Sequence, residues 1–139
     1  MAAPTKTPVF ISFDYDHDRD LKELLVGQSR HTKRPFSITD HSIRKETIGW
    51  KADARKRIAR AHVVIVICGL HTHQAVGVAG EVQIAKEEGV KYRLLRGRKD
   101  GTVQRPKGTS ALTDPINDWT WANLRATTDM RPWWQKILS

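Results

Sequence analysis

Cysteine is almost absent from this sequence of 139 residues, which contains only Cys68. A single thiol cannot form an internal disulfide, and this usage suits a reducing compartment. No N-terminal apolar stretch resembles a signal peptide, and the longest apolar run, Val63 to Cys68, is far too short to cross a bilayer. We therefore expect a soluble, cytoplasmic protein without a membrane partner.

Acidic residues are also in short supply, with 15 Asp and Glu against 24 Lys and Arg, which gives a formal net charge of +9. Such a balance attracts polyanions: nucleic acid, nucleotides or acidic proteins. The basic residues fall on several predicted elements rather than on one stripe. This distribution disfavours nucleic acid as a partner without excluding it.

No internal repeat or long low-complexity segment divides the chain, and its length fits one domain spanning residues 1–139. Strands are predicted at Val9–Phe13, Phe36–Thr39, Val63–Cys68 and Tyr92–Leu95, with helices between them. The third strand is apolar without alternation, as expected for a central parallel strand covered on both faces. This order predicts an α/β fold, with three layers around an open parallel sheet of four to five strands.

The pattern weakens past Arg96, where a loop rich in Gly, Lys and Arg is predicted. A fifth edge strand between Thr102 and Ile116 is conceivable, but the pattern does not show it. A last helix is predicted over Trp119 to Ala126. We expect residues 1–7 to be flexible and residues 127–139, with Trp133 and Trp134, to form a C-terminal docking segment.

Ligands of open parallel sheets bind beyond the carboxyl ends of the strands, where the connection order reverses. The first predicted strand ends in Ser12-Phe13-Asp14-Tyr15-Asp16, the second in Thr39-Asp40 and the third in Gly69-Leu70-His71-Thr72-His73. The third loop leads into a helix that carries Glu81. We therefore expect Glu81 to share a cleft with Phe13, Asp14 and His71.

Glu81 is the most informative residue of that helix. Val78, Val82 and Ala85 mark its inward face, and at about 100° per residue Glu81 falls at the edge of this stripe. Helical side chains lean toward the N-terminus, so the carboxylate should project over Gly77, which has no side chain. This vacancy suggests a ligand pocket, although geometry alone favours a surface glutamate beside a small-residue helix contact.

Several other chemistries do not fit the pattern. A calcium loop starting at Asp14 would need Gly and Glu where Arg19 and Leu25 stand. A phospho-acceptor receiver needs an Asp at the end of the third strand, which here ends in Cys68. His71 and His73 are too few for a metal site, and no glycine-rich phosphate or dinucleotide loop is present.

Two residue types are better explained by packing than by chemistry. Cys68, at the end of a core strand, is expected to pack rather than to act as a nucleophile. Trp119 and Trp121 could stack nucleic acid bases, but we expect them to pack a closing helix.

Three separated motifs resemble a known family. They are the segment Phe10 to Leu21, the strand Val64 to Gly69 with its histidine loop, and Gly77-Val78-Ala79-Gly80-Glu81. Together they look like the TIR-like domains of flavodoxin-type fold, which include the NAD-processing subunit of the Thoeris antiphage defence system. The resemblance runs from about Val9 to Leu124 and implies a flavodoxin-like sheet of four or five parallel strands.

The resemblance also implies an activity. It gives Glu81 the role of the catalytic glutamate and places the nucleotide near Ser12, Phe13, Asp14 and His71. Such enzymes release nicotinamide from NAD and form ADP-ribose or a cyclised relative, so NAD is expected as a substrate, with no cofactor and no metal. The product would be a diffusible signal that activates a separate effector.

The residues themselves suggest how this reaction would proceed. An ionised Glu81 would stabilise positive charge that develops on the ribose as nicotinamide leaves. Phe13 or Tyr15 could stack on a ring, and Lys51 is a candidate to neutralise the pyrophosphate. The Asp residues from position 14 to 16 are expected to cap the following helix or to hold ribose hydroxyls.

One departure from better-known TIR enzymes concerns the position four residues before the glutamate. Many of them carry Trp there, and this chain has Gly77, so the choice of substrate and product stays open. Two other functions remain as alternatives: a non-catalytic interaction domain that assembles with its own copies or with partners, and a basic module that binds polyanions.

Overall fold

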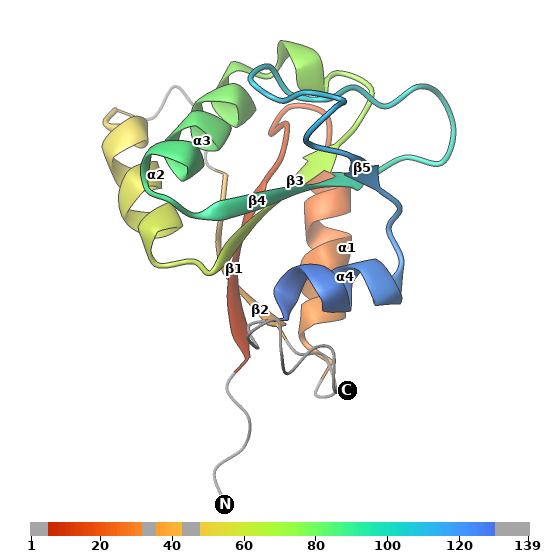
Figure 1. Ribbon diagram of the computed structural model, residues 1–139, viewed down its shortest axis with the longest axis horizontal. Helices are drawn as coiled ribbons and strands as arrows, with labels where there is room; N and C mark the ends of the chain where they lie inside the picture. The colour runs from red at the N-terminus through yellow and green to blue at the C-terminus, as the bar shows by residue number, and fades with distance from the viewer. Residues whose placement is uncertain (1–5, 32–35, 43–47, 130–139) are drawn as a thin grey trace, which may run out of the picture.

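The structure is a computed structural model that describes residues 6–31, 36–42 and 48–129. Its five strands form one parallel sheet in the order β2-β1-β3-β4-β5. The strands are β1 (Thr7–Ser12), β2 (Phe36–His41), β3 (Val63–Cys68), β4 (Lys91–Arg96) and β5 (Ile116–Asn117). The sheet lies between two layers of helices (Figure 1), which is the flavodoxin-like α/β architecture that the sequence predicts.

The helices divide between the two faces of the sheet according to their buried stripes. The elements are α1 (Arg19–Ser29), α2 (Trp50–Ala59), the 3₁₀ turn η1 (Thr72–Gln74), α3 (Val76–Glu87) and α4 (Trp121–Thr128). Ile58 of α2 and Val82 of α3 belong to one core cluster, and Leu25 of α1 and Leu124 of α4 belong to the other. The chain therefore builds two cores, one on each face.

The alternation of side chains along the central strands decides which residues meet which helices. Val64 and Val66 of β3 join Phe10 of β1 in the core under α2 and α3, whereas Ile65 and Ile11 join the core under α1. All six residues of β3 are buried, which explains its continuous apolar pattern.

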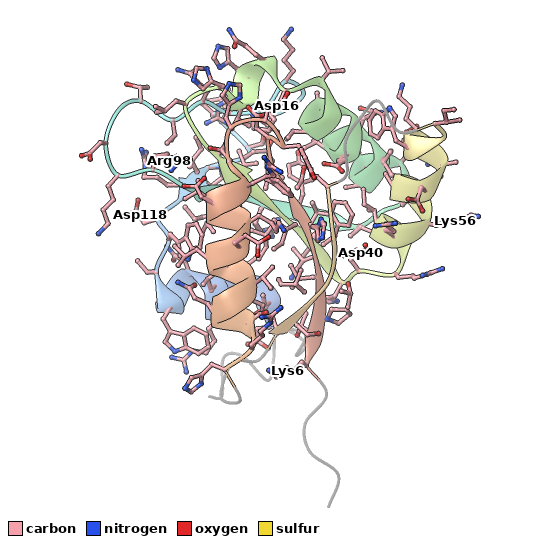
Figure 2. All side chains as sticks on the ribbon, turned by 180° about the vertical axis from the view of Figure 1, so that it is seen from behind. Lys6, Asp16, Asp40, Lys56, Arg98 and Asp118 are labelled. Atoms are coloured by element: carbon pink, nitrogen blue, oxygen red, sulfur yellow. The ribbon has the colours of Figure 1, made fainter. Side chains whose placement is uncertain are left out.

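The connection order reverses between β1 and β3. The chain passes from β1 through α1 to β2 at one edge, then returns through α2 to β3, and continues through α3 to β4 and on to β5. Asp16, just after β1, and Arg98, just after β4, lie at the same end of the molecule, whereas Lys6, before β1, lies at the opposite end (Figure 2). The end with Asp16 holds the carboxyl ends of the strands and is where such folds bind ligands.

Several boundaries differ from the prediction because hydrogen bonds decide where an element ends. The first strand begins at Thr7, whose hydroxyl donates to the Thr128 carbonyl at 2.6 Å, so Thr7 is part of the fold rather than of a flexible end. The fifth strand is only Ile116–Asn117, at the last residue of the window considered. Thr120 caps α4 by accepting from the Asn123 N–H, so the helix starts two residues later than Trp119. The predicted docking of residues 130–139 lies outside the described residues.

Three expectations about composition can be compared with the described residues. Cys68 is fully buried, and burial raises the pKa of its thiol to about 12, which fits packing rather than nucleophilic chemistry. No helix in the described ranges has the length and apolarity to span a bilayer. Among the same residues no cluster of His, Cys, Asp and Glu has the makings of a metal site.

Candidate active site

Glu81 lies on α3 but points across the sheet to the end of β1. Its side chain is buried, with 2% of the residue exposed. Its Oε1 accepts a hydrogen bond from the Ser12 hydroxyl at 2.8 Å and another from the Ser42 hydroxyl at 2.5 Å. Ser12 faces α3 because it follows Phe10 by two residues on β1 and so shares its side of the sheet. Both hydroxyls bind the same oxygen, which leaves Oε2 as the oxygen that can contact a ligand.

Ser42 connects the carboxylate to the backbone of two strands. It follows β2, and its N–H donates to the Ile11 carbonyl at 2.9 Å, extending the pairing between β1 and β2. Its hydroxyl accepts from the Phe13 N–H at 3.0 Å while donating to Glu81. The serine thus fixes the start of the loop after β1 and the position of the carboxylate together.

Burial dominates the ionisation of Glu81. It raises the pKa of the carboxyl to about 7, even though the hydrogen bonds from Ser42 and Ser12 act in the opposite direction by stabilising the charged form. A carboxyl with this pKa exchanges its proton near neutral pH, which is the range in which general acids, bases and charge stabilisers work.

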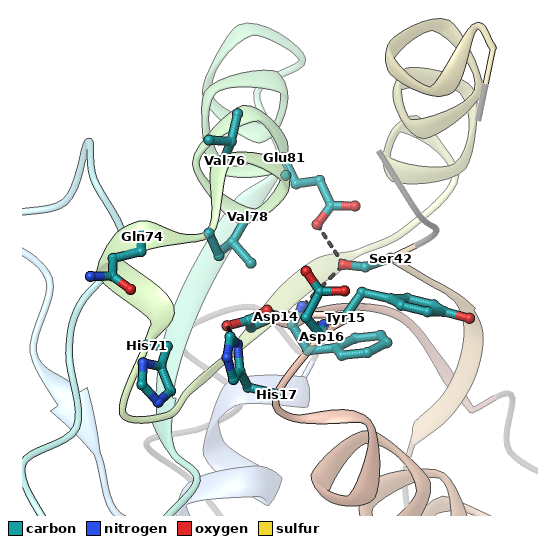
Figure 3. Close-up of a pocket in the computed structure, with 13 residues that line it drawn as sticks. Asp14, Tyr15, Asp16, His17, Ser42, His71, Gln74, Val76, Val78 and Glu81 are labelled. Carbon is teal, nitrogen blue, oxygen red and sulfur yellow. Dashed lines mark hydrogen bonds and ion pairs between the residues drawn. The ribbon is translucent and has the colours of Figure 1, made fainter. Parts of the chain in front are cut away.

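A pocket of about 220 Å³ opens beside this carboxylate. Its walls come from the loop after β1, from Ser42, and from the segment that joins β3 to α3 (Figure 3). The lining residues are Phe13, Asp14, Tyr15, Asp16, His17, Ser42, His71, Gln74, Ala75, Val76, Gly77, Val78 and Glu81. The volume is below the roughly 300–1,000 Å³ of typical small-molecule sites, so the pocket fits one end of a dinucleotide rather than all of it.

The loop after β1 is shaped by Asp14. One carboxylate oxygen accepts from the Asp16 N–H at 3.1 Å and the other lies 2.7 Å from Nδ1 of His17. The Asp14 carbonyl also accepts from the N–H of Asp18 at 2.8 Å, just before α1 begins. Asp14 therefore builds the turn that carries His17. The expectation that these Asp residues cap α1 was wrong, because Asp18 is the N-cap residue and makes no side-chain cap hydrogen bond.

The loop after β3 is held in a similar way. The Gly69 N–H donates to the Thr72 hydroxyl at 2.7 Å, and η1 closes with Gln74 N–H donating to the His71 carbonyl at 2.9 Å. These bonds bring His71 against His17, with ring centroids 4.2 Å apart and an interplanar angle of 27°.

The structure brings most of the predicted site residues together. Phe13, Asp14, Tyr15, His71 and Gly77 line the pocket with Glu81, and the rings of Phe13 and Tyr15 stack with centroids 5.8 Å apart. Ser12 lies beneath the pocket, fully buried, and reaches it only through Glu81. A Cβ added at Gly77 would meet no atom within 4 Å, so the vacancy at this position is real open space.

Lys51 is the exception among the predicted residues. It is exposed on the first turn of α2, where its Nζ lies 5.9 Å from the centroid of the Trp50 ring, and it is not among the residues that line the pocket. The prediction that Lys51 neutralises a pyrophosphate here is therefore wrong: its charge is directed along α2 rather than into the site.

The sequence interpretation missed Ser42, His17 and Gln74. A signal for Ser42 existed, because residues just past a parallel strand point toward the site, but the second strand was ended at Thr39 and the strand continues to His41. His17 is three residues after Asp14, the spacing of a turn, and its pairing with His71 depends on two loops meeting.

A second buried carboxylate lies near the site but outside the pocket lining. Asp18 is 1% exposed, and its Oδ1 accepts from the guanidinium of Arg98 at 3.1 Å. Its other oxygen has no hydrogen-bond partner among the described residues. A Cβ added at Gly69 would come within 2.3 Å of that oxygen. Burial raises the pKa of Asp18, against the opposing effect of Arg98.

With this geometry in hand, the chain can be compared with known proteins. The family model described as "Thoeris protein ThsB, TIR-like domain" matches residues 10–96. That range includes β1 to β4 and every residue that lines the pocket. It ends at the last residue of β4, whereas the resemblance seen in the sequence extended to Leu124. No curated protein matches the chain.

Proposed function

This chain belongs to the family of Thoeris ThsB TIR-like domains, which act in antiphage defence signalling, and we propose that its reaction is the cleavage of the bond between nicotinamide and ribose in NAD. NAD would be the substrate, and ADP-ribose or a cyclic relative the product. One observation carries this proposal: a buried glutamate, held by two hydroxyls and without a cationic partner, borders a pocket at the switch point of the sheet.

The first step would break the C1′–N bond of the ribosyl nicotinamide. The bonding electron pair leaves with the nicotinamide nitrogen, which becomes neutral, and positive charge develops on the ribose. An ionised Glu81 would stabilise this charge, because the buried pocket offers little water to compete with it. The hydrogen bonds from Ser12 and Ser42 keep the carboxylate in one orientation.

The second step decides the product. A water that attacks C1′ and loses one proton gives ADP-ribose, whereas attack by an adenine nitrogen closes a ring. Oε2 of Glu81 is placed to orient the ribose hydroxyls during either attack. The stacked rings of Phe13 and Tyr15 offer an aromatic wall for a base or for nicotinamide. The product would then activate a separate effector.

The test is to incubate the purified protein with NAD and to follow nicotinamide and the nucleotide products by chromatography and mass spectrometry. We expect nicotinamide release from the wild type, and none above background from Glu81→Gln, a change that keeps the size of the side chain and the acceptor oxygen for the two serines. A variant that consumes NAD at the wild-type rate would refute the role of Glu81.

The pH dependence supplies a second readout. Because the pKa of Glu81 is raised to about 7 and the ionised form is the one proposed to act, kcat/KM should rise with pH and level off above about pH 7. If the wild type releases no nicotinamide even at high protein concentration, where copies can assemble, the non-catalytic interaction domain becomes the better description.

A further inference from the structure

The lining of the pocket is poor in positive charge, although the molecule as a whole is basic. Three carboxylates, from Asp14, Asp16 and Glu81, contribute to it. Among the lining residues of the described chain, the only basic side chains are His17 and His71, and neither Lys nor Arg is present. A phosphate group entering this pocket would therefore meet carboxylates unless the two histidines hold it.

The two histidines are held in position by the fold. Oδ2 of Asp14 lies 2.7 Å from Nδ1 of His17, and a carboxylate can only accept a hydrogen bond, so Nδ1 is the donor. This bond fixes the ring of His17 and turns its Nε2 away from Asp14. His71 then stacks on that ring, 4.2 Å away. The side chain of His17 is 49% exposed, so the pair is accessible to a ligand.

The pair also lies at a distinct part of the pocket. In Figure 3, His17 and His71 stand next to each other on the far side of the pocket from Glu81, with the loop of Asp14 between them. The volume of about 220 Å³ fits only one end of a dinucleotide. A ligand whose ribose contacts Glu81 must therefore extend its remaining groups toward a rim of this pocket.

We propose that the stacked pair His17 and His71 binds the diphosphate of the nucleotide, while the ribosyl nicotinamide lies against Glu81. This inference rests on the proposed function, because it takes NAD as the ligand. The nicotinamide ring of NAD is cationic and suits the end where Glu81 lies, whereas the diphosphate is anionic and needs N–H donors. The imidazoles are the side chains of the lining that can supply such donors to an anion.

The test compares two ligands that differ in phosphate. The affinities of NAD and of nicotinamide riboside, which has no phosphate, are measured by calorimetry in the Glu81→Gln background, where no turnover is expected. His71→Phe and His17→Phe are added to this background, since phenylalanine keeps a ring for stacking and removes the ring nitrogens. Each should weaken NAD binding about tenfold, the effect of one lost charge-assisted hydrogen bond, and change the affinity for nicotinamide riboside by less than twofold.

Two control variants make the result specific. His31→Phe changes an exposed histidine directly after α1, at the opposite end of the sheet, and should leave both affinities unchanged. Arg19→Gln removes the nearest rival cation, a guanidinium 5.1 Å from the ring of Tyr15. His71→Phe is the cleaner of the two histidine variants, because His71 has no bond to Asp14 that its removal would break.

Each outcome decides the inference. It is overturned if the histidine variants weaken both ligands equally, if they weaken neither, if only Arg19→Gln weakens NAD, or if neither ligand binds. Nicotinamide release by the protein with Glu81 intact is measured separately. Histidine-dependent NAD binding without nicotinamide release would refute the proposed reaction and leave the diphosphate site standing, and release without that dependence would do the reverse.

Discussion

Glu81 and Asp18 are both buried carboxylates near the carboxyl ends of the strands, yet their surroundings differ. Asp18 faces the guanidinium of Arg98, which also bonds both carboxylate oxygens of Asp20. Glu81 has only the hydroxyls of Ser12 and Ser42 as hydrogen-bond donors. Burial raises the pKa of both groups, and only Asp18 has a cation to offset part of the cost.

This difference separates a structural carboxylate from one that is available for chemistry. The Arg98 guanidinium ties the loop after β4 to the start of α1, and Gly69 closes off the second oxygen of Asp18. No such closure exists at Glu81, which borders the pocket. A buried charge without a cation costs stability and is retained where it has a function. The comparison therefore predicts opposite responses to mutation at the two sites.

The largest expected effect is on turnover. Removal of a charge that stabilises a transition state commonly costs about a hundredfold to a thousandfold in kcat, so Glu81→Gln should lose at least about two orders of magnitude in nicotinamide release. Asp18→Asn, the matched change outside the pocket, should retain activity within about threefold once its folding is verified. Initial rates with NAD, measured on both variants at one pH, test the contrast. Equal losses in the two variants would remove the distinction.

The next effect concerns the pH dependence of stability. The folded pKa of Glu81, about 7, is above its ordinary value of 4.5. The native state therefore keeps a proton that the unfolded chain releases, and the free energy of unfolding falls as pH rises from 4.5 to 7. Below 4.5 both states are protonated, and above 7 the cost has reached its full value.

Glu81→Gln cannot titrate, so it should escape this cost. Relative to the wild type, its stability should grow by about 3 kcal/mol between pH 4.5 and pH 8. Urea unfolding of both proteins across this range measures the difference. A constant difference across the range would mean that Glu81 is ionised throughout and that its environment is more polar than the structure indicates.

Arg98→Met should have the opposite sign. It keeps the length of the side chain but leaves Asp18 buried without a cation, which should destabilise the fold by about 2 kcal/mol, less than for a fully buried pair because Arg98 is partly exposed. The double variant with Asp18→Asn should recover part of the loss. Denaturant unfolding at neutral pH checks both, and a neutral Arg98→Met would show that this ion pair contributes nothing.

Much of the fold could be predicted because apolar pattern and strand order suffice for it. The unbroken run of β3 identified the central strand, and the alternation of strands and helices gave the parallel sheet. The short edge strand Ile116–Asn117 could not be found, since two residues carry no periodicity and pair only because β4 is already in place. The cap at Thr120 was missed for a similar reason: its partner is fixed only once the helix forms.

The site was predictable only as far as its elements were. Glu81, Phe13, Asp14 and His71 follow from the rule that loops at strand ends converge. The sequence could not show that Glu81 would turn inward to Ser12, because the helix pattern placed it at the edge of the buried stripe. Charge alone also misplaced Lys51, since a basic residue near a site can still point along its own helix.

The smallest expected effect lies in the hydroxyls that hold Glu81. Each donates to Oε1 and favours the ionised form, so Ser42→Ala should raise the pKa of Glu81 further and move the rise of kcat/KM by about 0.5 to 1 pH unit toward alkaline values. Ser12→Ala removes one donor to the same oxygen and should cause a similar shift. The two variants differ in one respect, because only Ser42 also accepts from the Phe13 N–H. Ser42→Ala should therefore lower stability by about 1 kcal/mol more than Ser12→Ala does. A profile unmoved by both changes would mean that the hydroxyls position the carboxylate without tuning its charge.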